Sequence, residues 1–328
     1  MTRLADAHVL VTGGSSGIGL ETARAALARG ARVSIVARDV ERLTRARDDL
    51  ERSSGDGTRV VAEPADVTDP ERLGAALALL TTQLGPVDVL VTCAGAAYPG
   101  HFEDLPASAF DEQMALDYFG TLHAIRAVVP SMVERRRGHL LLVSSIIGLI
   151  GVYGYSAYAP AKFAVRGLAE TLRAELKPHG IVVACAYPPD TDTPGLAREN
   201  AHKPKATARI SAAVKVRSPG AVARSVVRGI EKDRLVVTAD PSTAVLARAS
   251  GLLGPYLRAS FDRHVRKADR ATGRRSDSVD RWPRRAPRPT AWGPSRCLPT
   301  ATGGRRPSGR CTTSRSVTSA CPGRSSGA

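Results

Sequence analysis

The sequence predicts an α/β fold in which helices cover both faces of a doubly wound parallel sheet. Strand-like apolar runs alternate with amphipathic, helix-like segments from residue 8 to about 240, and no repeat or linker interrupts this alternation. The chain has 328 residues, of which 43% are hydrophobic, so it can bury a sizeable core and is not disordered throughout. We therefore expect a single domain over residues 1–240.

Seven apolar runs are expected to form the strands of this sheet. In chain order they cover residues 8–12, 32–37, 58–62, 87–92, 139–144, 181–186 and 234–238. The segments between them have helical periodicity. In residues 156–177, for example, Val165, Leu168, Leu172 and Leu176 share one helix face while charged residues fall elsewhere.

A glycine-rich turn follows the first expected strand. A helix-like segment beginning at Leu20 is preceded by the run Thr12-Gly13-Gly14-Ser15-Ser16-Gly17-Ile18-Gly19. Glycines let the backbone approach a pyrophosphate, whose charge is stabilised by the free N–H groups and the dipole of a helix N-terminus. An ordinary strand-to-helix turn is the alternative. The position after the first strand of a βαβ unit favours a Rossmann-type dinucleotide site.

The end of the second expected strand bears on the choice of cofactor. The chain there reads Ala37-Arg38-Asp39. An acidic residue at this point binds the ribose 2′-hydroxyl of NAD, whereas an arginine accommodates the 2′-phosphate of NADP. Arg38 favours NADP, and Asp39 competes unless its carboxylate points away. We expect NADPH as the cofactor, with Arg38 as an ordinary surface charge as the alternative.

Three residues are candidates for the chemistry. Tyr158 and Lys162 have i, i+4 spacing at the start of an expected helix, so both side chains project from one face. An ammonium there stabilises tyrosinate, so we expect Lys162 to lower the phenol pKa from about 10. Ser145 ends an expected strand, where its hydroxyl can hold a substrate carbonyl for hydride transfer. A Tyr-x-x-x-Lys pair alone is more often an exposed helix pair. Its combination with Ser145 and the glycine loop predicts a nicotinamide-dependent reductase.

With these residues in place, the sequence resembles the short-chain dehydrogenase/reductase family over residues 5–240. The glycine loop corresponds to the family's T-G-x-x-x-G-x-G, and Ser145, Tyr158 and Lys162 correspond to its catalytic residues. The resemblance adds cofactor contacts from Asp66-Val67, from Thr92-Cys93-Ala94-Gly95 and from Thr193. The expected cofactor residues are then Gly13, Ser15, Ser16, Gly17, Ile18, Gly19, Arg38, Asp66, Val67, Ala94, Gly95, Tyr158, Lys162 and Thr193.

Several stretches are similar to one branch of this family, the 3-ketodihydrosphingosine reductases. The longest are residues 186–195 and 162–170. The similarity implies reduction of the ketone of 3-ketodihydrosphingosine, or of a similar long-chain lipid ketone, with NADPH. A steroid-like or fatty-acyl ketone is the alternative substrate, because residues 190–215 and 98–102 set the substrate's shape and pattern rules say little about them.

The sequence departs from the family at Asp117. The family usually has a fourth catalytic residue here, an asparagine, so Asp117 is a candidate catalytic residue that puts the proton relay behind Lys162 in doubt. Aspartate has a short polar side chain of nearly the same shape as asparagine, so we expect Asp117 to preserve the backbone geometry at this position. Thr92 also replaces the first asparagine of the family's N-N-A-G turn, which we interpret as a structural change.

The two ends of the chain lead to further expectations. Residues 1–8 are too polar for a signal peptide and do not match the N-terminal membrane segment of eukaryotic members of the branch, so we expect a cytoplasmic protein, peripheral to a membrane at most. The five cysteines have neither metal-ligand spacing nor a disulfide framework, so no metal site is expected. The expected partners are a small lipid-like ketone and further copies of the chain in a homo-oligomer.

Two segments follow the expected domain. Residues 241–270 predict a helical appendage interrupted at Gly251, Gly254 and Pro255. Its apolar and basic residues suit an interfacial contact with lipid, or else packing against the domain or an oligomer partner. Residues 271–328 predict a disordered tail rich in Arg, Pro, Ser and Gly, and residues 275–328 hold eleven Arg against two Asp. Its composition resembles a gene read out of frame. A nucleic-acid arm on an inactive scaffold is the remote alternative, disfavoured because the Ser, Tyr and Lys are all present.

Overall fold

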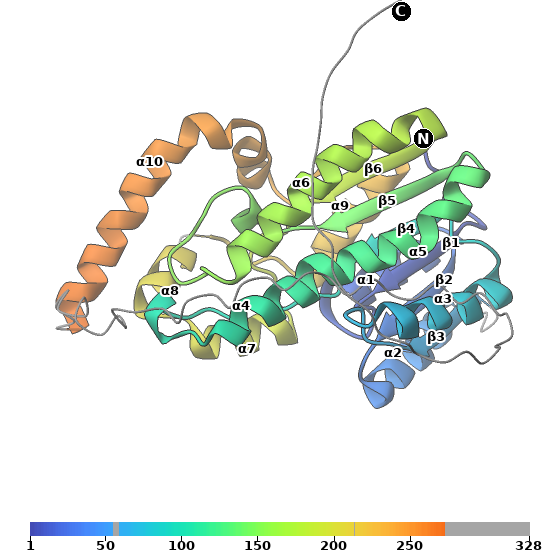
Figure 1. Ribbon diagram of the computed structural model, residues 1–328, viewed down its shortest axis with the longest axis horizontal. Coiled ribbons are helices and arrows are strands. Elements are labelled where there is room, and N and C mark those ends of the chain that lie inside the picture. The colour runs from blue at the N-terminus through green and yellow to red at the C-terminus, as the bar shows by residue number, and fades with distance from the viewer. Residues whose placement is uncertain (55–58, 213, 273–328) are drawn as a thin grey trace, which may run out of the picture. The chain divides into compact units, whose positions relative to one another are not determined.

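The computed structural model describes residues 1–54, 59–212 and 214–272. They contain a seven-stranded sheet in which every pair of neighbouring strands is parallel, with helices on both faces (Figure 1). The strand order is β3-β2-β1-β4-β5-β6-β7, so the direction of winding reverses between β1 and β4. This arrangement confirms the predicted doubly wound α/β fold, and it opens a crevice at the carboxyl ends of β1 and β4.

Strands β1, β2 and β6 coincide with the expected apolar runs, and the other four differ from them in their limits. The bounds are β1 His8–Thr12, β2 Arg32–Ala37, β3 Val60–Pro64, β4 Val89–Thr92, β5 Gly138–Val143, β6 Ile181–Ala186 and β7 Val236–Val237. The expected ranges 58–62, 87–92, 139–144 and 234–238 were wrong in their limits. At the β3 edge, Pro64 still pairs with Ala37, because a proline is tolerated in an edge strand. At the other edge β7 pairs with β6 through two residues.

Helices form the layers above and below the sheet. They are α1 Gly17–Leu27, α2 Val40–Ser54, α3 Pro70–Leu84, α4 Ala107–Gln113, α5 Gly120–Glu134, α6 Tyr158–Leu176, α7 Pro194–His202, α8 Lys205–Ser211, α9 Pro219–Glu231 and α10 Pro241–Thr272. Local signals account for several starts: Asp69 accepts hydrogen bonds from two backbone N–H groups at the start of α3, and Ser218 caps α9. Between α4 and α5, residues Met114–Phe119 form a π-helical segment.

The core has two halves because neighbouring strand residues point to opposite faces of the sheet. Leu10, Leu90 and Leu140 pack beneath α3, α5 and α6. Val9, Val89 and Leu141 pack against α1, α2 and α9 on the other face. All six are completely buried, as the continuous apolar runs predict for a sheet covered on both sides.

Helix α10 begins where the sequence predicts the appendage, and contacts α8 (Figure 1). Its Leu246, Leu257 and Phe261 pack against the core half that contains α3, α5 and α6. The expected interruptions at Gly251, Gly254 and Pro255 were wrong, because helical geometry is lost at Ala249 instead. The packing of Leu257 and Phe261 offsets the cost of a proline inside the helix. The predicted tail lies outside the described residues from 273 onward.

Candidate active site

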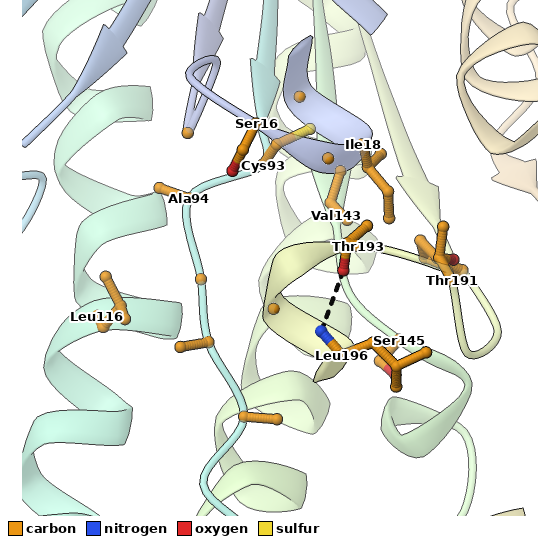
Figure 2. Close-up of a pocket in the computed structure, with 18 of the residues that line it drawn as sticks. Ser16, Ile18, Cys93, Ala94, Leu116, Val143, Ser145, Thr191, Thr193 and Leu196 are labelled. Atoms are coloured by element: carbon orange, nitrogen blue, oxygen red, sulfur yellow. Dashed lines mark hydrogen bonds between the residues drawn. The ribbon is translucent and has the colours of Figure 1, made fainter. Parts of the chain in front are cut away.

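A cavity of about 350 Å³ lies at the carboxyl ends of the central strands. The loops that follow β1, β2, β4, β5 and β6 line it, which is where a doubly wound sheet places its ligands. In Figure 2, Ala94 and Leu116 lie on one side of it, and Ser145, Thr193 and Leu196 lie on the other. All of the expected cofactor residues line this cavity except Asp66.

The glycine loop forms a narrow cradle at one end of the cavity. Gly13 has φ of +69°, and a Cβ atom there would lie 2.6 Å from the backbone nitrogen of Ala94. Gly17 has φ of +56°, and a Cβ atom there would lie 2.9 Å from Cγ2 of Thr193. Ser16 precedes α1 without a side-chain capping bond, which leaves the first-turn N–H groups of α1 to an incoming acceptor. The residues present therefore fit the pyrophosphate of a dinucleotide.

Two arginines follow β2: Arg38 lies directly after the strand, and Arg42 lies in the first turn of α2. Arg38 is 65% exposed and lies 3.4 Å from Asp66. Arg42, which the sequence analysis missed, lines the cavity one helical turn after Arg38. The Asp39 carboxylate accepts from the Arg42 backbone N–H at 3.0 Å and from its guanidinium at 2.6 Å. The competing carboxylate is therefore neutralised by Arg42 and tied to the start of α2.

The placement of Asp66 differs from the expectation. Its Oδ1 accepts from both the backbone N–H and the hydroxyl of Thr68, while Oδ2 faces Arg38. Its neighbours Ala65 and Val67 line the cavity in its place. The side chain of Asp66 thus organises the turn after β3.

The structure brings Ser145, Tyr158 and Lys162 to one wall of the cavity. Tyr158 is the first residue of α6, and the Lys162 Nζ lies 5.6 Å from the centre of its ring. Ser145 follows β5, and its hydroxyl oxygen accepts from the Ile147 backbone N–H at 3.2 Å at the start of a short 3-10 turn. A strand end and a helix start thereby place the hydroxyl, the phenol and the ammonium side by side.

The ammonium group of Lys162 forms an ion pair with the Asp117 carboxylate. The Nζ lies 3.0 Å from Oδ1 of Asp117 and donates to the Val143 carbonyl at 3.2 Å. Asp117 is completely buried in the π-helical segment, and Gln113 donates to its other oxygen. Burial alone lowers the pKa of Lys162, but the Asp117 carboxylate outweighs it and holds that pKa above its usual value. Lys162 is therefore a permanent cation at neutral pH.

The pKa of Tyr158 contradicts the expectation of a lowered value. Burial raises it to about 12, although Lys162 acts in the lowering direction. A group with a raised pKa keeps its proton until the pH approaches that value. The phenol is therefore protonated throughout the neutral range, which is the form that a proton donor requires.

The sequence pattern of the short chain dehydrogenases matches residues 7–204 of this chain. The chain belongs to this family. Relatives include the 3-ketodihydrosphingosine reductase of Bos taurus, 44% identical over 227 residues that cover 69% of this chain and 68% of the relative. The 3-dehydrosphinganine reductase of Danio rerio is 41% identical over 255 residues, 77% of each chain. This short-chain dehydrogenase is thus an oxidoreductase acting on CH–OH groups, similar to the 3-ketodihydrosphingosine reductases, with a small-molecule substrate.

Solved structures show the same fold. A short-chain dehydrogenase from Sphingobium yanoikuyae in complex with NADPH has a TM-score of 0.65 at 27% identity, and the match covers 77% of this chain and 95% of that one. Levodione reductase has a TM-score of 0.67 at 25% identity, covering 73% and 98%. These likenesses support a nicotinamide cofactor for this short-chain dehydrogenase.

The segment after β6 supplies a further group of residues that line the cavity of this short-chain dehydrogenase. Thr193 accepts from the Leu196 backbone N–H at 3.1 Å and so begins α7 (Figure 2). The sequence analysis named Thr193 but missed other lining residues, among them Leu116, Ile147, Leu196 and Glu199. Arg42 had a detectable signal in its spacing from Arg38. Leu196 and Glu199 fall within residues 190–215, which the sequence assigned only as a range to the substrate's shape. Leu116 and Ile147 had no signal, because their segments meet only in the folded chain.

Proposed function

We propose that this short-chain dehydrogenase reduces 3-ketodihydrosphingosine, or a closely similar long-chain amino ketone, with NADPH. The observation that carries the proposal is the meeting of Ser145, Tyr158 and Lys162 with the glycine cradle in one cavity. The substrate is supported by relatives of that name at 44% and 41% identity. The preference for NADPH is supported by Arg38 and Arg42 at the ribose end.

Some of the cavity residues bind the cofactor and the substrate, and others take part in proton transfer. NADPH supplies the hydride that the carbonyl carbon accepts. The cradle and the α1 N-terminus would hold the pyrophosphate, and Arg38 and Arg42 would bind the 2′-phosphate. Ser145 hydrogen-bonds to the carbonyl oxygen and orients it. Tyr158 donates its phenolic proton to that oxygen as it becomes a hydroxyl, and Lys162 stabilises the tyrosinate that remains.

Steady-state NADPH oxidation tests this proposal. The wild-type chain is given 3-ketodihydrosphingosine, a steroid ketone and a fatty-acyl β-ketone in parallel. We expect the highest kcat/KM for the long-chain amino ketone. A higher value for either of the other ketones would replace the proposed substrate with the alternative that the sequence left open.

The cofactor preference can be tested at Arg38. Arg38→Ala is expected to weaken NADPH binding by about 1.5–3 kcal/mol, the range for a hydrogen bond to a charged group, and to leave NADH binding unchanged. Fluorescence titration with both cofactors measures this. Arg45→Ala is the matched control, because Arg45 is an arginine of α2 that is 74% exposed and does not line the cavity. Equal losses for NADPH and NADH at Arg38 would make the residue structural.

We also propose that one face of α10 contacts lipid. No helix in the described part of the chain is long and apolar enough to cross a membrane. Leu252 is 88% exposed and Tyr256 is 69% exposed one turn later, while Leu257 and Phe261 pack inward. Exposed Arg248 and Arg263 lie on the same helix. A helix with a packed face and an exposed apolar and basic face suits an interfacial contact with a substrate-bearing bilayer.

Vesicle co-sedimentation tests the α10 contact. The full chain with Leu252→Gln and Tyr256→Gln is expected to bind phosphatidylcholine vesicles at least tenfold more weakly, because each apolar side chain contributes about 1.5–3 kcal/mol on burial. Vesicles without net charge keep the arginine-rich tail from dominating. Leu79→Gln is the control, because Leu79 is 55% exposed on α3. Equal binding of variant and wild type would exclude α10 as the contact. The homo-oligomer and the cytoplasmic location stay predictions.

A further inference from the structure

A buried group of charges lies at the substrate end of the cavity. The Lys203 Nζ lies 3.0 Å from Oε1 of Glu199 and 3.3 Å from Oδ2 of Asp190. The Lys203 side chain is 3% exposed, and the two carboxylates are 15% and 17% exposed. Glu199 and Asp190 line the cavity, whereas Lys203 does not. Two carboxylates therefore share one ammonium, so these three side chains together carry a formal charge of −1, with the Arg198 guanidinium also lining the cavity.

Glu199 is held in place by contacts that use only one of its oxygens. Tyr155 donates its hydroxyl hydrogen to Oε1, the same atom that faces Lys203. Oε2 has no hydrogen-bond or ion-pair partner among the described residues. Oε2 is not among the buried unpartnered atoms of the described residues, so it can accept from a cationic donor that enters the cavity. The arrangement is thus a fixed acceptor facing the cavity.

This acceptor is close to the reacting centre. The buried ring of Tyr155 lies 5.8 Å from the ring of Tyr158, so Glu199 is connected to the proton donor through one side chain. The charge of Glu199 adds to the raising of the Tyr158 pKa that burial causes. Glu199, Tyr158 and Ser145 line the same cavity, so a ketone held at Tyr158 and Ser145 shares that cavity with the Glu199 carboxylate.

We propose that Glu199 recognises the ammonium group of the substrate, with Asp190 and Lys203 completing the charge balance. The inference rests on the proposed function, because 3-ketodihydrosphingosine carries its amine on the carbon beside the ketone. A steroid or fatty-acyl ketone has no cation to place there and would leave Glu199 unpaired. Glu199 is thus the residue that separates amino ketones from neutral ketones.

The test compares two ketones in the full chain. Glu199→Gln keeps a carbonyl oxygen for Tyr155 and Lys203 and removes the charge. With NADPH, kcat/KM for 3-ketodihydrosphingosine is expected to fall by about tenfold or more, the effect of a lost charge-assisted hydrogen bond. For the analogue of equal chain length that lacks the amine, it is expected to change by less than about threefold. Glu175→Gln is the matched control, because this exposed carboxylate of α6 lies outside the cavity and undergoes the same chemical change.

Each outcome distinguishes the inference from the proposed function. Equal losses for both ketones would show that Glu199 acts only through Tyr155 and Tyr158, which overturns the inference and leaves the proposed function standing. A wild type that reduces neither ketone would overturn both. Glu199→Asp, which keeps the charge on a shorter side chain, is expected to show a smaller but still selective loss. If thermal melting shows that Glu199→Gln does not fold, an unselective loss in Glu199→Asp overturns the inference.

Discussion

Replacing Tyr158 with phenylalanine is expected to lower turnover by about 10²–10⁴-fold, the usual contribution of a general acid. The variant loses the phenolic proton but keeps the ring that packs beside Tyr155. NADPH binding should therefore stay within about a factor of two. Steady-state NADPH oxidation with a long-chain ketone gives the turnover, and fluorescence titration gives the binding.

Tyr118→Phe is the matched control for this substitution. Tyr118 packs edge-on against Phe119 and does not line the cavity. Removal of its hydroxyl should leave turnover unchanged, so that a loss in Tyr158→Phe reflects the position and not the chemistry of the change. Turnover of Tyr158→Phe within a factor of two of the wild type would contradict its assignment as the acid.

Asp117→Ala is expected to lower the free energy of unfolding by about 3–5 kcal/mol, because it leaves a buried ammonium without its partner. The side chains of Lys162 and Asp117 are 6% and 0% exposed, so water cannot replace the lost carboxylate. Chemical denaturation measures the change. Unchanged stability would show that the ion pair between these residues does not support the fold.

Asp117→Asn separates charge from shape at the same position. The amide oxygen can still accept from Lys162, and the side chain keeps the size that the π-helical segment encloses. We expect a smaller loss of stability than for Asp117→Ala and turnover that is preserved or raised, because asparagine is the usual residue of the family here. A folded, NADPH-bound variant without activity would give Asp117 a chemical role of its own.

The features that the sequence by itself determined all follow from patterns among residues that are close together in the chain. The central strands and the two-sided core follow from apolar runs whose alternate residues point to opposite faces. Gly13 and Gly17 follow from the need for positive φ in one turn. The pairing of Tyr158 with Lys162 follows from helical spacing. Each of these features lies within one element or one turn, so neighbouring residues suffice to predict it.

Only the tertiary structure decided the protonation states in the site and the set of residues that line the cavity. The pKa of Tyr158 rises to about 12 because burial outweighs Lys162, and burial cannot be read from spacing. The Asp66 carboxylate accepts a hydrogen bond from Thr68, and Asp117 forms an ion pair with Lys162 from a different helical segment. No local sequence pattern predicts these two contacts. Glu199 lines the cavity because α7, which follows β6, lies against Tyr155 in the segment just before α6. Electrostatic free energies depend on distance and solvent exposure in three dimensions, and these exist only once distant segments have packed together.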